Sequence, residues 1–79
     1  MDAVEYLLSE GLDRVRVEAI DRLVAHLCSL TEEECIAKYR KGRKEHNQDL
    51  EAIATEKELR EEAMDIVNYA AISMLQKHQ

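Results

Sequence analysis

The chain has 79 residues, the size of one small domain, and we expect residues 1–79 to fold as a single unit. It has no Pro, Trp or Phe and only two Gly, so it lacks the turn residues of a β-rich fold, whereas good helix formers are abundant. The formal net charge of −6 argues against general binding to nucleic acid, and no apolar run approaches the length of a membrane span.

Capping residues and apolar spacing predict two helices in the N-terminal half. Asp2 can cap a short helix over residues 3–10, which Gly11 ends. Asp13 can cap a second helix that runs to about Ser29. In both segments the apolar residues recur at helical spacing, which predicts a face toward the core. Those residues are Val4, Leu7 and Leu8 in the first helix and Val17, Ile20, Leu23, Val24 and Leu27 in the second.

A capping box predicts the start of a third helix. Thr31 and Glu34 have the spacing at which each side chain bonds the backbone N–H of the other, so this helix should cover about residues 32–44. Gly42 either ends the helix early or is tolerated within it. The predicted apolar side consists of Cys35, Ile36 and Tyr39.

A second capping box, formed by Thr55 and Glu58, predicts a last helix over about residues 56–77. The best loop candidate is segment 46–50, and residues 50–54 can form a helical turn before the last helix. The expected fold is all-α, a small bundle of about four helices that oligomerisation completes, because the apolar stripes are short. The predicted core face of the last helix consists of Leu59, Ala63, Ile66, Ala70 and Met74.

Acidic side chains of the last helix lie beside its predicted core face and not opposite to it. At 100° per residue, Glu58, Glu62 and Asp65 fall within one narrow sector, which we call the acidic row. Tyr69 lies in the same sector. Mg²⁺ prefers oxygen ligands, and residues three and four apart share a face, so the row can hold one metal ion, with Glu61 less well aligned. The alternative is a solvated acidic face whose charges suit the start of a helix.

A basic run with one aromatic residue occupies the end of the third helix. Its functional interpretation is a clamp for phosphates, with Tyr39 available to stack on a base. The alternative is a helix C-terminus whose cations suit the helix dipole. His46 follows the run and can bond a phosphate or transfer a proton, and its alternative is a solvent-exposed loop histidine. The cations of the run are Lys38, Arg40, Lys41, Arg43 and Lys44.

Two segments of the C-terminal half carry a pattern with a known counterpart. They are Tyr39-Arg-Lys-Gly-Arg-Lys-Glu-His-Asn-Gln-Asp-Leu50 and Leu59-Arg-Glu-Glu-Ala-Met-Asp-Ile-Val-Asn-Tyr69. Together they resemble small phage-type relatives of the MazG-like all-α nucleotide pyrophosphohydrolases. In that superfamily a Glu-x-x-Glu pair on one helix and a Glu-x-x-Asp pair on the next hold Mg²⁺ against a nucleotide triphosphate. The second pair falls on Glu62 and Asp65.

The first acidic pair of that pattern has only partial counterparts in this chain. Glu58 and Glu61 have its spacing but share a helix with the second pair. Glu45 and Asp49 have a different spacing and lie near the predicted loop. The resemblance therefore extends to half of the metal-binding motif.

The resemblance implies a Mg²⁺-dependent nucleoside triphosphate pyrophosphohydrolase, a homo-oligomer whose subunits share the active region. Glu58, Glu62 and Asp65 would be metal ligands, and Glu61 and Glu62 would act in catalysis. An alternative is a non-catalytic phage protein, which keeps the pocket and sequesters a nucleotide or a cyclic-nucleotide immune signal. The implied substrate-binding residues are Tyr39, Lys41, Arg43, Lys44, His46, Asp49 and Tyr69.

Other interpretations stay open. Segment 23–41 can pass for a helix-turn-helix, which would make DNA a partner despite the acidic charge. An antitoxin or an inhibitor of a host protein is a further alternative. A zinc site from His26, Cys28, Cys35 and His46 lacks the usual ligand spacing, and both cysteines suit small core positions. The first residues lack the basic segment of a secretory signal, so we expect a cytoplasmic location, in the bacterial host if the gene is a phage gene.

Overall fold

The computed structural model describes residues 1–46 and 53–77, and every regular element in this part of the chain is an α-helix. The helices are α1 (Ala3–Glu10), α2 (Leu12–Ser29), α3 (Glu32–His46) and α4 (Thr55–Lys77). The predicted all-α bundle of about four helices is therefore confirmed. None of these described helices is long and apolar enough to cross a membrane.

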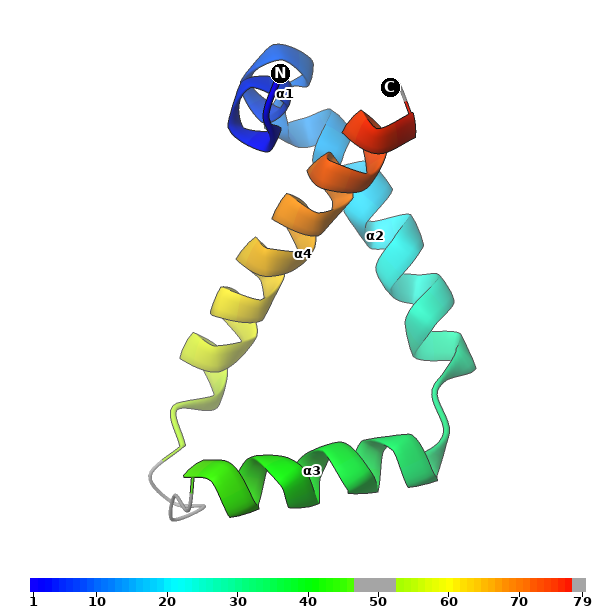
Figure 1. Cartoon of the computed structure of the whole chain (residues 1–79), viewed down its shortest axis with the longest axis vertical. Coiled ribbons are helices and arrows are strands. Elements are labelled where there is room, and N and C mark those ends of the chain that lie inside the picture. The colour runs from blue at the N-terminus through cyan, green and yellow to red at the C-terminus, as the bar shows by residue number, and fades with distance from the viewer. Residues whose placement is uncertain (47–52, 78–79) are drawn as a thin grey trace.

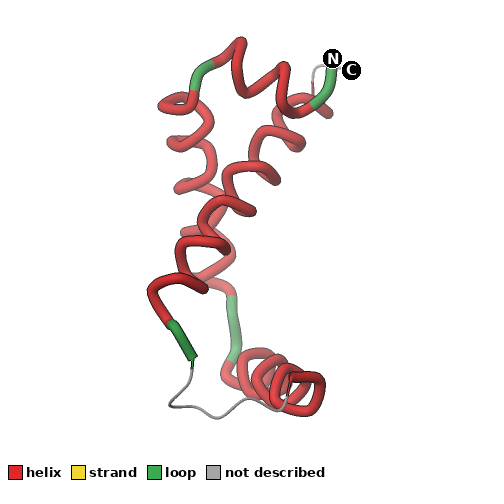
Figure 2. The backbone as a smooth tube through the Cα atoms, turned by 90° about the vertical axis from the view of Figure 1, so that its left-hand side faces the viewer, coloured by secondary structure: helices red, strands yellow, loops and turns green. Residues whose placement is uncertain are grey.

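The helices outline an open triangle, with α2, α3 and α4 as its sides (Figure 1). α1, with the N-terminus of the chain, lies at the corner where the N-terminal half of α2 meets the C-terminal half of α4. Figure 2, turned by 90°, shows α3 at the far end from that corner. The radius of gyration is 15.4 Å, against about 12 Å for a compact chain of this length. A single chain is therefore much more open than a closed bundle.

The core lies at the corner where α1, α2 and α4 meet. Val15 is fully buried there, and Met74 closes the cluster from the C-terminal end of α4. Several core positions carry alanine, and small side chains let two helices approach closely. Among the described residues α3 contributes nothing to this core and packs against no other helix. The buried residues are Tyr6, Val15, Ala19, Ala70, Ala71 and Met74.

The prediction of the core face of α2 is wrong: within a single chain, α2 does not bury the predicted residues. α4 packs on another side of this helix, where Val15 and Ala19 lie. The small side chains at Ala19, Ala70 and Ala71 allow a close helix contact, which the apolar spacing alone does not reveal. The residues of the predicted face are exposed: Val17, Ile20, Leu23, Val24 and Leu27.

Of the three residues predicted to form the core-facing side of α1, one does face the core. Leu7 packs against the core, whereas Val4 and Leu8 are exposed. Tyr6 takes the buried position of this helix. α1 is short and meets α2 and α4 at one corner, so a single turn of it is covered.

The predicted core face of α4 is covered only near the corner where α1, α2 and α4 meet, and the predicted apolar side of α3 is not covered by any described helix. Ile66 and the residues after it on the α4 stripe pack in or against the core, but Leu59 and Ala63 are exposed. α4 diverges from α2 toward its N-terminus, so no other described helix covers its first turns (Figure 1). The predicted apolar side of α3 is exposed throughout: Cys35, Ile36 and Tyr39.

The junction between α1 and α2 is made by a glycine. Asp2 caps α1 as predicted, since its Oδ1 accepts the Glu5 N–H at 2.9 Å. Gly11 ends α1 with φ 91° and ψ 145°, a conformation open to glycine. α2 begins at the next residue, so Asp13 lies within its first turn and is not the predicted N-cap. Its Oδ1 instead accepts from Arg16 Nη1 at 2.8 Å.

Gly11→Ala should lower the free energy of unfolding by about 1–3 kcal/mol, because an alanine at this φ and ψ is strained. No atom lies within 4 Å of the added Cβ, so the cost is one of backbone conformation. Urea denaturation followed by circular dichroism measures the difference. Gly42→Ala is the matched control: it lies in a helix with open space around it and should not destabilise the protein. Equal midpoints for Gly11→Ala and the wild type would contradict the prediction.

α3 begins as predicted. The Thr31 N–H donates to Glu34 Oε2 at 2.9 Å, and the Glu34 N–H donates to Thr31 Oγ1 at 3.2 Å. Gly42 is tolerated within the helix, which continues to His46. His46 is therefore helical and not the first residue of the predicted loop.

α4 begins one residue earlier than predicted, at Thr55. The Glu58 N–H donates to the backbone carbonyl of Ala54 at 3.0 Å, which replaces the predicted bond to the Thr55 side chain. Residues 53–54 are not helical, so the predicted turn does not extend to them. The other residues of that turn, and the loop predicted at 47–50, lie outside the described residues.

Candidate functional site

The acidic row lies on one exposed face of α4, together with Tyr69, which is 71% exposed. Within the described part of the chain, the side chains of Glu58, Glu62 and Asp65 take part in no hydrogen bond or ion pair. A helix rises 1.5 Å per residue, so the row extends about 10 Å along α4. Its carboxylates are therefore free to bind a cation from solution.

Repulsion within this face is not compensated by neighbouring cations. Glu58 and Glu62 are four residues apart, as are Glu61 and Asp65, and each like-charge pair costs about 0.2–0.5 kcal/mol on a helix. The residues 1–46 and 53–77 contain no group of three or more His, Cys, Asp or Glu side chains that could hold a metal ion. One chain therefore offers carboxylate pairs on neighbouring turns. Such a pair fits Mg²⁺, which takes one or two carboxylates and completes its shell with water and phosphate oxygens.

The basic run lies at the same corner of the triangle as the start of α4. The C-terminal half of α3 carries Lys41, Arg43 and Lys44, and Figure 1 places this end of α3 beside the beginning of α4. Lys38 and Arg40 extend the run toward the middle of α3 and are exposed. In the described chain none of these cations forms an ion pair with the acidic row. The cations at the end of α3 thus lie near the beginning of α4, whereas the acidic row extends from Glu58 to Asp65 at the middle of that helix, and α3 does not pack on α4 in the described chain.

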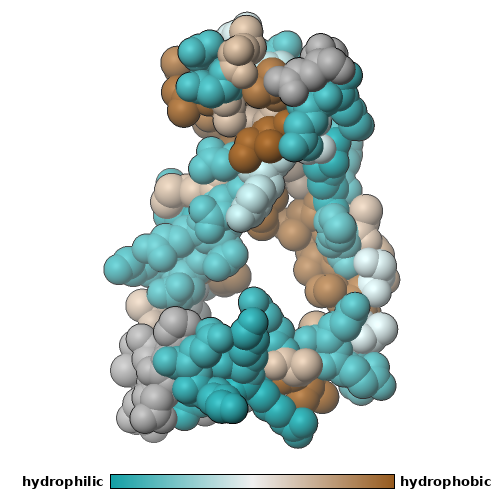
Figure 3. Space-filling view, in the orientation of Figure 1, coloured by the Kyte–Doolittle hydropathy of each residue, from teal (hydrophilic) through white to brown (hydrophobic). Residues whose placement is uncertain are grey.

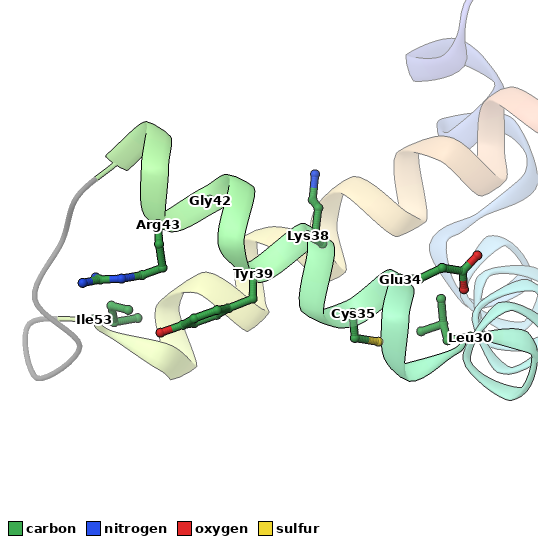
Figure 4. Close-up of a pocket in the computed structure, with 8 residues that line it drawn as sticks. All are labelled: Leu30, Glu34, Cys35, Lys38, Tyr39, Gly42, Arg43 and Ile53. Atoms are coloured by element: carbon green, nitrogen blue, oxygen red, sulfur yellow. The ribbon is translucent and has the colours of Figure 1, made fainter.

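A pocket of about 570 Å³ runs along α3, from Leu30 just before the helix begins to Arg43 and Ile53 near the beginning of α4. Figure 4 shows the side chains of Tyr39 and Arg43 extending toward Ile53. Nη1 of Arg43 is buried and has no hydrogen-bond partner in the described structure. An aromatic ring beside a guanidinium with unused donors suits a flat base carrying phosphates. The lining residues are Leu30, Glu34, Cys35, Lys38, Tyr39, Gly42, Arg43 and Ile53.

The sequence did not single out Leu30, Glu34 or Ile53 as pocket residues. Leu30 and Ile53 are isolated apolar residues outside the helices, next to helix ends. Their place next to a helix end is the feature of the sequence that could have identified them as pocket residues, because an apolar residue at a helix junction either joins a core or lines an exposed cleft. The sequence pattern around Glu34 indicated only its role in the capping box with Thr31, and not its place in the pocket.

A smaller groove of about 350 Å³ lies between α2 and α4. Tyr69, which lies in the same sector of α4 as the acidic row, lines this groove from α4. Arg22 and His26 line the groove from α2. Nε of Arg22 donates to Glu18 Oε1 at 2.9 Å, so this guanidinium is already engaged. The groove places Tyr69 against α2 and well away from Tyr39. The two predicted tyrosine contacts therefore belong to different clefts of one chain.

The remaining predicted residues are not brought into these clefts. Nothing is described for Asp49 or for the side chain of His46, which lie outside the described residues. Cys28 and Cys35 are free and exposed, so neither fills the predicted core position. α2 and α3 diverge from the turn at Leu30 without packing, unlike the paired helices of a helix-turn-helix.

The arrangement can thus bind cations on α4 and phosphates on α3. Apart from Arg43, which is half-buried, both groups lie on exposed helix faces and are open to solvent. The comparisons with protein-family models, curated proteins and solved structures found no match for this chain.

Proposed function

We propose that this chain is a nucleotide-handling protein, and specifically a Mg²⁺-dependent nucleoside triphosphate pyrophosphohydrolase of the MazG-like type. The observation that supports this function is that α4 carries unpaired carboxylates, while the end of α3 next to the beginning of α4 carries cations that form no ion pair in the described chain. Uncompensated charges of both signs suit a ligand that has phosphates and brings a metal ion. The resemblance of the segments around Glu62 and Asp65 points to the same chemistry.

Each group would have a distinct role. Glu62 and Asp65 would hold Mg²⁺ as a pair of carboxylates, and Glu58, one turn earlier along α4, would attract the ion to this face. The ion would supply charge neutralisation at the phosphate oxygens and favour ionisation of a nearby water. Glu61, on the adjoining side of α4, would orient that water and accept its proton.

The substrate would lie between the two charged helices. Arg43, with Lys41 and Lys44, would hold the phosphates, and Tyr39 would stack on the base. Attack of water on the α-phosphorus forms the new P–O bond, and pyrophosphate leaves with the bonding electron pair. The products are a nucleoside monophosphate and pyrophosphate. Since Tyr39 and Tyr69 lie in different clefts of one chain, the site would draw on residues of more than one subunit.

Incubation with each nucleoside triphosphate and Mg²⁺ should release the monophosphate and pyrophosphate in equal amounts. Ion-exchange chromatography of the nucleotides measures both products. Removal of the metal ion with EDTA should stop the release, and added excess Mg²⁺ should restore it. If no triphosphate is turned over at any Mg²⁺ concentration, the enzyme proposal is wrong.

A second function, sequestration of a nucleotide or cyclic-nucleotide signal by a phage protein, is favoured by one observation. The described residues hold no group of three or more metal-ligating side chains, yet the pocket at Tyr39 and Arg43 is present. A binder needs the pocket and not the metal ion. Calorimetry with and without Mg²⁺ separates the two functions: tight binding without metal, with intact ligand recovered afterwards, identifies the binder.

A further inference from the structure

An unfilled apolar seam runs along α2. Val17 is 60% exposed, Ile20 53%, Val24 50% and Leu27 57%, and we call these four residues the α2 seam. Their spacings of three, four and three residues place them at the a and d positions of a heptad repeat, the pattern by which two helices pair. Apolar surface is visible along α2 in the space-filling view (Figure 3).

The helices of the same chain do not cover this seam. Val15 and Ala19 mark the side of α2 that packs on α4. At 100° per residue the middle of the seam lies about 140° around the helix from that side. α3 packs on no helix of the described chain, and α1 meets the N-terminal end of α2. The seam therefore needs a helix from another molecule.

The exposed area of the chain matches the size of a dimer interface. Its accessible surface is 6853 Å², whereas a compact monomer of 9.1 kDa exposes roughly 4,900 Å². The excess is about 2,000 Å². Obligate homodimers bury about 1,000–2,500 Å² from each subunit. This excess belongs to the whole open chain, in which α3 packs on no other described helix, and the α2 seam is one part of it.

We propose that a second copy of this chain pairs with the first along the α2 seam, as a parallel two-stranded helix pair. Valine occupies both a positions, Val17 and Val24, while Ile20 and Leu27 occupy the d positions. β-branched residues at a with leucine at d favour parallel pairs of two strands, and the two valines and Leu27 fit this pattern, whereas the β-branched Ile20 does not add to it. The same patch serves both copies, as twofold symmetry requires.

The residues beside the seam favour the parallel direction. In a parallel pair, Arg16 at position g lies next to Asp21 at position e of the second copy, and the charges are opposite. Leu23 at position g would likewise lie next to Cys28 at position e of the second copy. Both residues are exposed in a single chain, so this contact would widen the apolar interface. An antiparallel pair would instead place Asp21 next to Asp21 of the second copy. Arg16 is held by an exposed ion pair to Asp13, which costs little to exchange.

Cysteine cross-linking tests both the seam and its direction. The background carries Cys28→Ser and Cys35→Ser. Leu27→Cys should form a disulfide-linked dimer with oxidised glutathione, since the two d residues of one layer face each other only in a parallel pair. The control is Val4→Cys, which is 66% exposed on α1 and should stay monomeric on a denaturing gel. If Leu27→Cys links only to Val17→Cys in a mixture, the pair is antiparallel, and the proposed direction is overturned.

Solution mass tests the dimer without cysteine chemistry. Sedimentation equilibrium should give twice the 9.1 kDa chain mass for the wild type. Val24→Lys should weaken association by tenfold or more, while Val4→Lys should leave it unchanged. A wild-type protein that stays monomeric at micromolar concentration would overturn the proposal. This inference does not depend on nucleotide chemistry, so a confirmed dimer without turnover would contradict only the enzyme proposal.

Discussion

Val15→Asp should unfold the protein. Val15 has no exposed surface and lies where α1, α2 and α4 meet. A buried carboxylate without a partner costs several kcal/mol, and a small single core supplies only about 3–5 kcal/mol. Met74 and the alanines around it offer no group that could compensate the charge. Circular dichroism at 222 nm should therefore show loss of most of the helical signal at 25 °C.

Val4→Asp is the matched control for this change. Val4 is 66% exposed and lies in the first turn of α1, where a negative charge is favourable. Its effect on the free energy of unfolding should stay within about 0.5 kcal/mol. If Val15→Asp and Val4→Asp melt at similar temperatures, the corner of α1, α2 and α4 is not the core of this protein.

Asp65→Asn should lower kcat/KM for nucleotide hydrolysis by about 10³-fold or more, if the protein is the proposed enzyme. The substitution keeps the shape of the side chain and removes a charged metal ligand, and a bound metal contributes several kcal/mol to the transition state. Asp65 is exposed and unpaired in the described chain, so the fold should be unaffected. The Mg²⁺ concentration needed for half-maximal rate should also rise. Initial rates over a range of Mg²⁺ concentrations measure both quantities.

Glu56→Gln serves as the control, since Glu56 is an exposed acid of the same helix outside the acidic row. It should leave the rate nearly unchanged. The competing interpretation makes an opposite prediction for Asp65→Asn. If the acids are only a solvated face, removal of one charge relieves its repulsion with Glu61 and stabilises α4 by about 0.2–0.5 kcal/mol without any effect on rate. Unchanged turnover with a slightly higher melting temperature would favour that interpretation.

Local signals in the sequence were reliable guides to the helices. Asp2 and the box of Thr31 and Glu34 make the predicted capping bonds, and these involve residues within one turn. The errors at Asp13 and Thr55 are shifts in where a helix begins, by two residues for α2 and by one residue for α4. At the first of these, Gly11 joins two helices directly through a positive φ, and a glycine can end one helix without a loop before the next.

The core was harder to predict, because apolar spacing shows which residues avoid water but not which molecule covers them. The α2 seam has the more regular spacing, yet a single chain buries Val15 and Ala19 instead. Close packing on Ala70 and Ala71 selects that side through shape. The same limit applies to the candidate site. The spacing of Glu62 and Asp65 defines their common face, whereas the nearness of the Tyr39 and Arg43 pocket to the start of α4 is visible only in three dimensions.

The sequence by itself determined that this protein is helical, where its helices cap, and which carboxylates share a face. The capping residues and the common face of Glu62 and Asp65 depend on residues three or four positions apart, whose relative placement the helix fixes, whereas the cooperation of carboxylates with cations is part of the proposed function. Only the tertiary structure decided that the long helices cross at one corner and diverge at the other. Side-chain volume at that corner sets this geometry, because two alanines on α4 allow a contact that the larger residues of the α2 seam would hold apart. The open end of the triangle, with its exposed seam and its charged corner, follows from that one contact.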